Sequence, residues 1–150
     1  MTKARILSLA VCLLLLACVA QAKQFAIIAD RDNGTANIKT VDLANILNGK
    51  TKTWSDGKAV KIILRDPNSA DMEIVFRRIL NMSPEQVRSL MQSHPGLIVV
   101  ADSDDAILRF VAATRGAIGV VDLYSLTKDV TVLKVDGKLP FDVGYILKGN

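Results

Sequence analysis

The chain has 150 residues, of which 50% are hydrophobic and 23% charged, with 19 Lys and Arg against 15 Asp and Glu. Acidic and basic residues are interspersed, so the small positive charge gives no reason to expect binding to nucleic acid or to a membrane surface. The single histidine, His94, excludes a multi-histidine metal site. Its position before Pro95-Gly96, a turn sequence, predicts a surface loop.

The first residues have the features of a secretory signal peptide. A short basic region, residues 3–5, precedes an almost unbroken apolar run over residues 6–20. Residues 20–22, Ala-Gln-Ala, form the small-x-small cleavage pattern, and the run is shorter than the roughly 20 apolar residues that a membrane-spanning helix needs. We therefore expect cleavage after Ala22, a periplasmic or secreted protein, and one domain of residues 23–150.

Two other interpretations of this segment stay open. Residues 15–18, Leu-Leu-Ala-Cys, resemble a bacterial lipobox, in which Cys18 becomes a lipidated N-terminus, and an uncleaved membrane anchor is the other alternative. Both cysteines, Cys12 and Cys18, lie in the apolar segment. The expected mature domain therefore has neither a disulfide nor a thiol, although export would permit a disulfide.

The rest of the chain alternates predicted strands with predicted helices. Short apolar runs predict buried strands, and apolar residues recurring on one helical face predict helices. Strands are expected at residues 25–29, 60–64, 97–101, 116–121, 130–135 and 141–147. Helices are expected at residues 40–48, 70–80, 84–94 and 103–114. This alternation predicts an α/β fold with a mixed, mostly parallel sheet and flanking helices.

Polar residues and glycines predict where these elements begin and end. Thr40 is expected to cap the first helix, and Asn48-Gly49 to end it. Ser83 with Gln86 has the pattern of a capping box. Asp136-Gly137 predicts a hairpin turn.

The loop that follows strand 60–64 offers a candidate oxyanion site. The candidate residues are Arg65, Asn68, Ser69, Ala70 and Asp71. The first N–H groups of a helix are unpaired and carry partial positive charge, so Arg65, the Ser69 hydroxyl and these groups could hold an anion. The alternative is a plain helix start, in which Asn68 or Ser69 is the N-cap and Asp71 an ordinary first-turn acid. That acid also opposes an anion.

The sequence gives little support for an enzyme. It contains no G-x-S-x-G motif, no glycine-rich phosphate loop with a lysine and no cluster of metal ligands. We expect no catalysis, no metal and no cofactor. Trp54, the only tryptophan, is expected to be a packing residue that closes the turn after Gly49, and Ser103 with its following acids a structural cap.

Three segments carry a resemblance to a known family. Residues 46–57 contain Gly49-Lys50 and Trp54-Ser-Asp-Gly, residues 62–76 run from a strand through a polar loop into a helix, and residues 110–120 contain Gly-Ala-Ile-Gly-Val. These segments resemble the phosphate-binding substrate-binding proteins of ABC transporters, and more narrowly one lobe of their type 2 periplasmic binding fold. The resemblance extends from Phe25 to Val121.

The resemblance implies a single three-layer lobe with a non-enzymatic role in transport. In the family the ligand lies in a cleft between two lobes, and this chain is too short for both. Arg65 and Ser69 match the family's phosphate contacts, but its Gly-Thr pair has become Ala70-Asp71, which loses a hydroxyl and adds a charge. We therefore expect weak or partner-assisted binding of phosphate or another oxyanion. The alternative is an interaction or sensor module without a ligand, which docks a periplasmic or inner-membrane protein.

Overall fold

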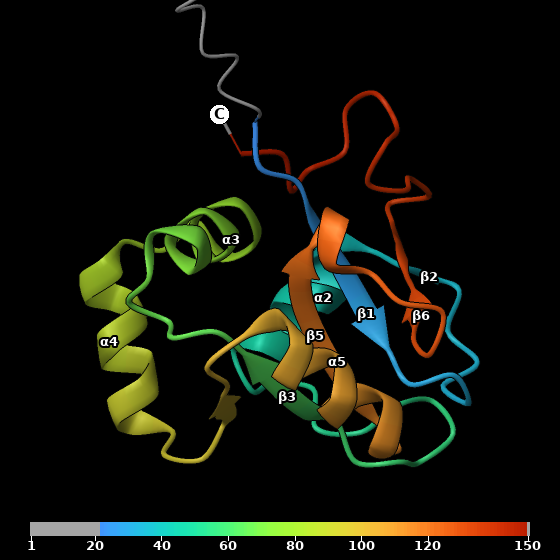
Figure 1. The fold of residues 1–150 in the computed structure, drawn as a ribbon. Coiled ribbons are helices and arrows are strands. Elements are labelled where there is room, and N and C mark those ends of the chain that lie inside the picture. The colour runs from blue at the N-terminus through green and yellow to red at the C-terminus, as the bar shows by residue number, and fades with distance from the viewer. Residues whose placement is uncertain (1–21, 150) are drawn as a thin grey trace, which may run out of the picture.

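The structure is a computed structural model that describes residues 22–149 (Figure 1). The expected leader lies outside the described residues apart from Ala22, and so does Cys18. In chain order the elements are β1 (Phe25–Ala29), β2 (Asn37–Ile38), α2 (Thr40–Leu47), β3 (Lys61–Leu64), α3 (Ala70–Leu80), α4 (Pro84–Ser93), β4 (Ile98–Val100), α5 (Asp104–Ala113), β5 (Ala117–Asp122), the 3-10 helix η1 (Leu123–Ser125), β6 (Thr131–Val132) and β7 (Lys134–Val135).

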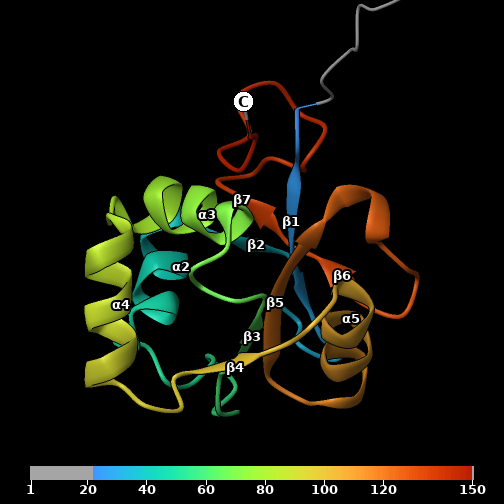
Figure 2. The same cartoon turned by 60° about the vertical axis from the view of Figure 1, so that its left-hand side comes forward.

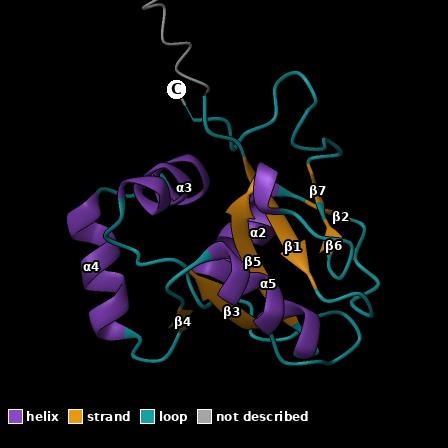
Figure 3. Ribbon diagram, viewed as in Figure 1, coloured by secondary structure: helices purple, strands orange, loops and turns teal. Residues whose placement is uncertain are grey.

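A five-stranded sheet with the order β4-β3-β5-β1-β6 organises the domain. β3 pairs in parallel with β4 and β5, whereas β1 pairs antiparallel with β5 and β6. Four strands of this sheet therefore point in one direction and β1 in the other. Helices α2 and α3 cover one face and α5 the other, which gives three layers (Figures 2 and 3). The predicted α/β class with a mostly parallel mixed sheet is confirmed.

The hydrophobic core has one cluster on each side of the sheet. In β1, Phe25, Ile27 and Ala29 join the cluster under α2 and α3, while Ala26 and Ile28 join the cluster under α5. Alternate residues of a strand point to opposite faces, so a strand buried on both sides is apolar throughout. Among the described residues, the buried apolar side chains all lie within 25–147.

The expected N-cap of α2 is wrong. Thr40 is the first helical residue, and Lys39 occupies the cap position without a side-chain hydrogen bond. The backbone N–H and hydroxyl of Thr40 instead donate to the Asp136 carboxylate at 2.9 and 2.6 Å. These hydrogen bonds lower the pKa of Asp136. A residue 96 positions away therefore stabilises this helix start, which local sequence patterns do not indicate.

Other predicted boundaries are confirmed. Ser83 and Gln86 form the capping box of α4, and Gly49 ends α2 with a φ of 78°. Asp136 and Gly137 both have positive φ, and Val135 pairs antiparallel with Lys138 across this turn. That conformation is typical of the tight two-residue hairpin turn that an Asp-Gly pair favours.

The C-terminal strands differ from the prediction. The expected strand 130–135 is divided at Leu133, since β6 pairs with β1 and β7 pairs in parallel with β2. The expected strand 141–147 is wrong, because these residues form turns and a bend, and the bridge to Gln24 belongs to Lys148, which follows them. Its alternation of apolar residues has another basis: Tyr145 and Leu147 are buried, whereas Val143 is exposed.

Trp54 closes the turn after α2, as expected. Its side chain is buried, and its indole N–H donates to the Gly116 carbonyl at 2.9 Å. The same carbonyl also accepts from the Lys61 N–H at 3.0 Å. The indole therefore holds the turn against the start of β5 through both packing and a hydrogen bond.

We expect Trp54→Ala to lower the free energy of unfolding by about 3–5 kcal/mol, the usual cost of removing a buried aromatic side chain. Trp54→Phe keeps most of the apolar surface and leaves the Gly116 carbonyl bonded to Lys61, so it should cost about 1 kcal/mol for the lost hydrogen bond together with a small packing loss. Urea unfolding followed by far-UV circular dichroism measures both. Equal costs for the two variants would contradict this division.

Candidate functional site

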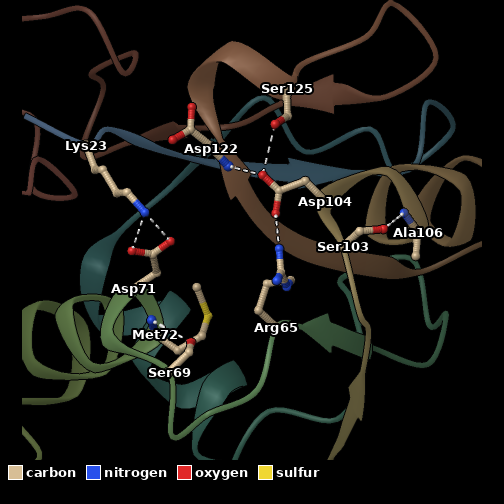
Figure 4. A network of polar contacts seen from close by, with 10 residues as sticks. All are labelled: Lys23, Arg65, Ser69, Asp71, Met72, Ser103, Asp104, Ala106, Asp122 and Ser125. Atoms are coloured by element: carbon tan, nitrogen blue, oxygen red, sulfur yellow. Dashed lines mark hydrogen bonds and ion pairs between the residues drawn. The ribbon is translucent and has the colours of Figure 1, made fainter. Parts of the chain in front are cut away.

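The candidate site lies at one edge of the sheet, where β3 ends and the helices α3 and α5 begin (Figure 4). Because β3, β4 and β5 are parallel, their carboxyl ends meet at this edge, and the segments that follow them lie close together. We call this surface the Arg65 face. Its charged and polar side chains are Lys23, Arg65, Ser69, Asp71, Asp104, Asp122 and Ser125.

The loop between β3 and α3 is shaped by Asp66. One carboxylate oxygen of Asp66 accepts from the backbone N–H of Asn68 at 2.9 Å and from its side-chain amide at 3.2 Å. The Asp66 carbonyl accepts from the Ser69 N–H at 2.9 Å. The Ser69 hydroxyl accepts from the Met72 N–H at 3.4 Å, so Ser69 is the N-cap. Of the two capping candidates in the sequence, the structure selects Ser69.

Arg65 points from the end of β3 toward the start of α5. Its Nη1 lies 3.6 Å from Oδ1 of Asp104, and the Arg65 side chain is 42% exposed. The other oxygen of Asp104 accepts from the backbone N–H of Asp122 at 2.9 Å and from the Ser125 hydroxyl at 3.0 Å. Asp104 therefore connects Arg65 to the segment that follows β5.

Asp71 in the first turn of α3 forms an ion pair with Lys23. Both carboxylate oxygens lie 2.8 Å from the Lys23 ammonium. This hydrogen bond raises the pKa of Lys23, opposed in part by desolvation. Since both groups are substantially exposed, the pair is expected to contribute little to the stability of the fold.

The Arg65 face therefore places three carboxylates beside two cations. Asp71 and Asp104 accompany Lys23 and Arg65, and the Asp122 carboxylate accepts from the Tyr124 N–H at 2.9 Å. The N-termini of α3 and α5 add partial positive charge at the same place. An anion bound here would gain from the helix ends and Arg65, and would have to compete with carboxylates already paired.

The structure brings some of the candidate site residues together and separates others. Arg65, Ser69 and Asp71 share the Arg65 face, while the Asn68 amide is engaged by Asp66 and Ala70 contributes only its backbone. Lys23 and Asp104 were missed by sequence reasoning. The parallel order of the predicted strands was a signal for Asp104, since helix starts that follow adjacent strands meet at one edge; Lys23 had none.

None of the helices in residues 22–149 is long and apolar enough to cross a membrane. In the same part of the chain, no group of three or more His, Cys, Asp or Glu side chains could hold a metal ion.

Comparisons with known proteins agree with this architecture. A family model described as a PBP superfamily domain matches residues 20–144. The phosphate-binding protein PstS of Bacillus subtilis (strain 168) is 32% identical over an alignment of 113 residues, and the match covers 73% of this chain and 35% of that protein. The chain thus spans about a third of that relative.

Solved structures share the fold. The crystal structure of PstS from Borrelia burgdorferi matches with a TM-score of 0.71 at 22% identity, covering 86% of this chain and 55% of that one. An ABC-type phosphate transport receptor from Vibrio cholerae matches with a TM-score of 0.71 at 15% identity, covering 85% and 54%. At these identities the likeness shows the fold alone.

Proposed function

Since this chain belongs to the PBP superfamily domain family and is related to the phosphate-binding proteins of ABC transporters, we propose that it binds phosphate or a similar oxyanion on the Arg65 face. It does so without catalysis, and weakly unless a second chain completes the site. Residues 1–22 are a leader that is removed on export, and residues 23–150 form the working domain.

The observation that supports this proposal is the position of the Arg65 guanidinium. It lies at the edge of the sheet where α3 and α5 both begin, and its side chain stays 42% exposed. A guanidinium offers paired N–H donors to a phosphate oxygen, and helix N-termini favour negative charge beside them. The Ser69 hydroxyl stands at the start of α3, where it can contact the same anion.

Weak affinity follows from exposure and from competing charge. One lobe leaves the anion open to water, which weakens charge-assisted hydrogen bonds. The carboxylates of Asp71 and Asp104 already pair with the two cations of the face. A dissociation constant of about 1 mM, or about 4 kcal/mol of binding free energy, is the expected order.

Isothermal titration of residues 23–150 with phosphate and sulfate at low ionic strength tests the proposal. We expect Arg65→Ala to weaken binding at least tenfold, because it removes the only guanidinium among the side chains of this face. Arg109→Ala is the matched control: Arg109 lies on α5 and pairs with Asp105. Absence of heat and of any thermal shift at high anion concentration would exclude oxyanion binding by the lone domain.

A second candidate function rests on the same carboxylates. Asp71 and Asp104 already neutralise the two cations of the Arg65 face. The face could therefore bind a periplasmic or inner-membrane protein in place of an anion, and the chain would then be an interaction or sensor module. A specific partner retained by both wild type and Arg65→Ala, together with no anion binding, supports this candidate over the first.

A further inference from the structure

Helix α4 is attached to the rest of the domain by fewer buried side chains than the other helices. Val87 is its one buried residue, whereas α2 and α5 each bury three residues and α3 buries four. Figures 1 and 2 show α4 at the outer margin of the domain. A segment with few buried apolar contacts opens at a lower free energy than the core of the same protein. We therefore expect α4 to be the least firmly held helix of the described chain.

The polar contacts of α4 do not connect it to another element. Its ion pair joins Glu85 to Arg88 at 3.0 Å, and the Ser93 hydroxyl donates to the Ser89 and Leu90 carbonyls at 2.8 and 3.2 Å. Its capping box lies in its own first turn. Within the part of the chain that the structure describes, no hydrogen bond or ion pair joins a side chain of α4 to a residue outside 83–94. Apolar contact therefore holds α4 against the domain.

The chain turns sharply at both ends of this segment. Asn81, between α3 and α4, has a φ of 52°, and Gly96, between α4 and β4, has a φ of 79°. A Cβ added at Gly96 would meet no atom within 4 Å, so this turn lies in open space. Residues at the ends of elements are the usual hinges, because they can change φ and ψ while the elements stay intact. These two turns allow α4 to move while α3 and β4 keep their positions.

A hollow of about 400 Å³ lies beside α4. Three side chains of α4 line it: Arg88, Met91 and Gln92. Strand β4 and residues 66–68, which belong to the loop between β3 and α3, line other parts of it. A movement of α4 would therefore change the size of a space that borders on the loop before Ser69.

We propose that α4 is a movable flap. It leaves the domain about the turns at Asn81 and Gly96 while the sheet and the other helices stay folded. Opening exposes Val87 and the part of the apolar cluster that Val87 covers, and it opens the hollow to solutes. The flap depends only on how α4 is held, so it is independent of anion binding on the Arg65 face.

Thiol labelling tests the flap. Residues 23–150 contain no cysteine, so Val87→Cys places a single thiol at the contact between α4 and the domain. Val75→Cys is the matched control, because Val75 is a buried valine of α3 in the same apolar cluster. Iodoacetamide in the absence of urea should modify Val87→Cys at least about a hundredfold faster than Val75→Cys, since the control thiol needs global unfolding.

The urea dependence of labelling separates local from global opening. Low urea should hardly change the rate for Val87→Cys, because a small opening exposes little surface, and should raise the rate for Val75→Cys steeply. Urea unfolding followed by circular dichroism gives the global stability of each variant, and hence the labelling rate that global unfolding alone would produce. Labelling of Val87→Cys at that rate, with the full urea dependence, would overturn the proposal.

Hydrogen exchange of unsubstituted residues 23–150 tests whether α4 opens as a unit. A helix as short as α4, with 10 residues, is marginally stable alone in water, so its amides should lose protection once it leaves the domain. We expect the amides of residues 88–94 to share one protection factor, at least about a hundredfold below that of residues 75–80 on α3. Equal protection of the two helices, or protection that declines gradually from one end of α4, would contradict a flap that moves as a unit.

Discussion

Replacing Gly116 by Ala should lower the free energy of unfolding by about 3–5 kcal/mol, the range of the largest single-substitution effects. Gly116 has a φ of +79°, and a Cβ there would lie 2.1 Å from the backbone carbonyl oxygen of Ala59. The clash is with main chain, which cannot rotate away as a side chain could. The turn before β5 would have to move.

Gly137→Ala is the matched control, since Gly137 has nearly the same φ of +78° but no atom within 4 Å of its added Cβ. That substitution carries only the conformational cost of a left-handed residue, about 1–2 kcal/mol. Chemical denaturation of both variants isolates the steric component at Gly116. Equal losses would mean that the Ala59 contact relaxes without cost.

A substitution at Gly116 is expected to cost this much stability because three segments form hydrogen bonds with its backbone. Its N–H donates to the buried Asp30 carboxylate at 2.8 Å, and its carbonyl accepts from Trp54 and Lys61. The residue thus joins the end of β1, the turn after α2 and the start of β3. A displaced Gly116 would disturb all of these contacts together.

Gly119, the second glycine of this run, is also required by packing. A Cβ at Gly119 would lie 2.7 Å from the Ile107 side chain and 3.2 Å from the Ile63 carbonyl oxygen. The absence of a side chain lets α5 lie directly against β5. The run Gly116-Ala-Ile-Gly119 therefore meets two packing requirements of this fold, and neither of them involves a ligand.

Much of the fold could be predicted because its signals are local. The Ser83 capping box, the end of α2 at Gly49 and the buried apolar run of β1 each depend only on residues a few positions apart in the sequence. The errors arose where distant residues decide the outcome. Asp136 caps α2 from the other end of the chain, and strand pairing with two different partners divides the segment 131–135.

In the candidate site, too, some features depend on local sequence and others on distant residues. Arg65 and Ser69 could be found because they adjoin the end of a strand and the start of a helix. The charged side chains that would favour or oppose an anion there come from distant parts of the sequence. Lys23 is 48 positions from its partner Asp71, and Asp104 belongs to the helix that follows a different strand. The place of the candidate site was therefore readable from the sequence, but its charge balance was not.

That charge balance leads to the second large effect: neutralising Asp71 and Asp104 together should raise phosphate affinity about a hundredfold. Each carboxylate repels a bound anion and neutralises a cation that could attract it. At a partly exposed site such a charge is expected to contribute about 1–2 kcal/mol, or roughly tenfold in affinity. Asp71→Asn releases Lys23, and Asp104→Asn releases Arg65.

Titration of the single and double variants with phosphate measures the effect, with Asp105→Asn as the matched control. Asp105 neighbours Asp104 on α5 but pairs outward with Arg109, and its side chain is 70% exposed. An increase for Asp104→Asn and none for Asp105→Asn would identify the internal ion pairs as the limit on anion binding. A decrease for Asp104→Asn would instead mean that Asp104 holds Arg65 in the orientation that receives the anion, because the amide keeps the shape of the carboxylate but loses most of its attraction for the guanidinium.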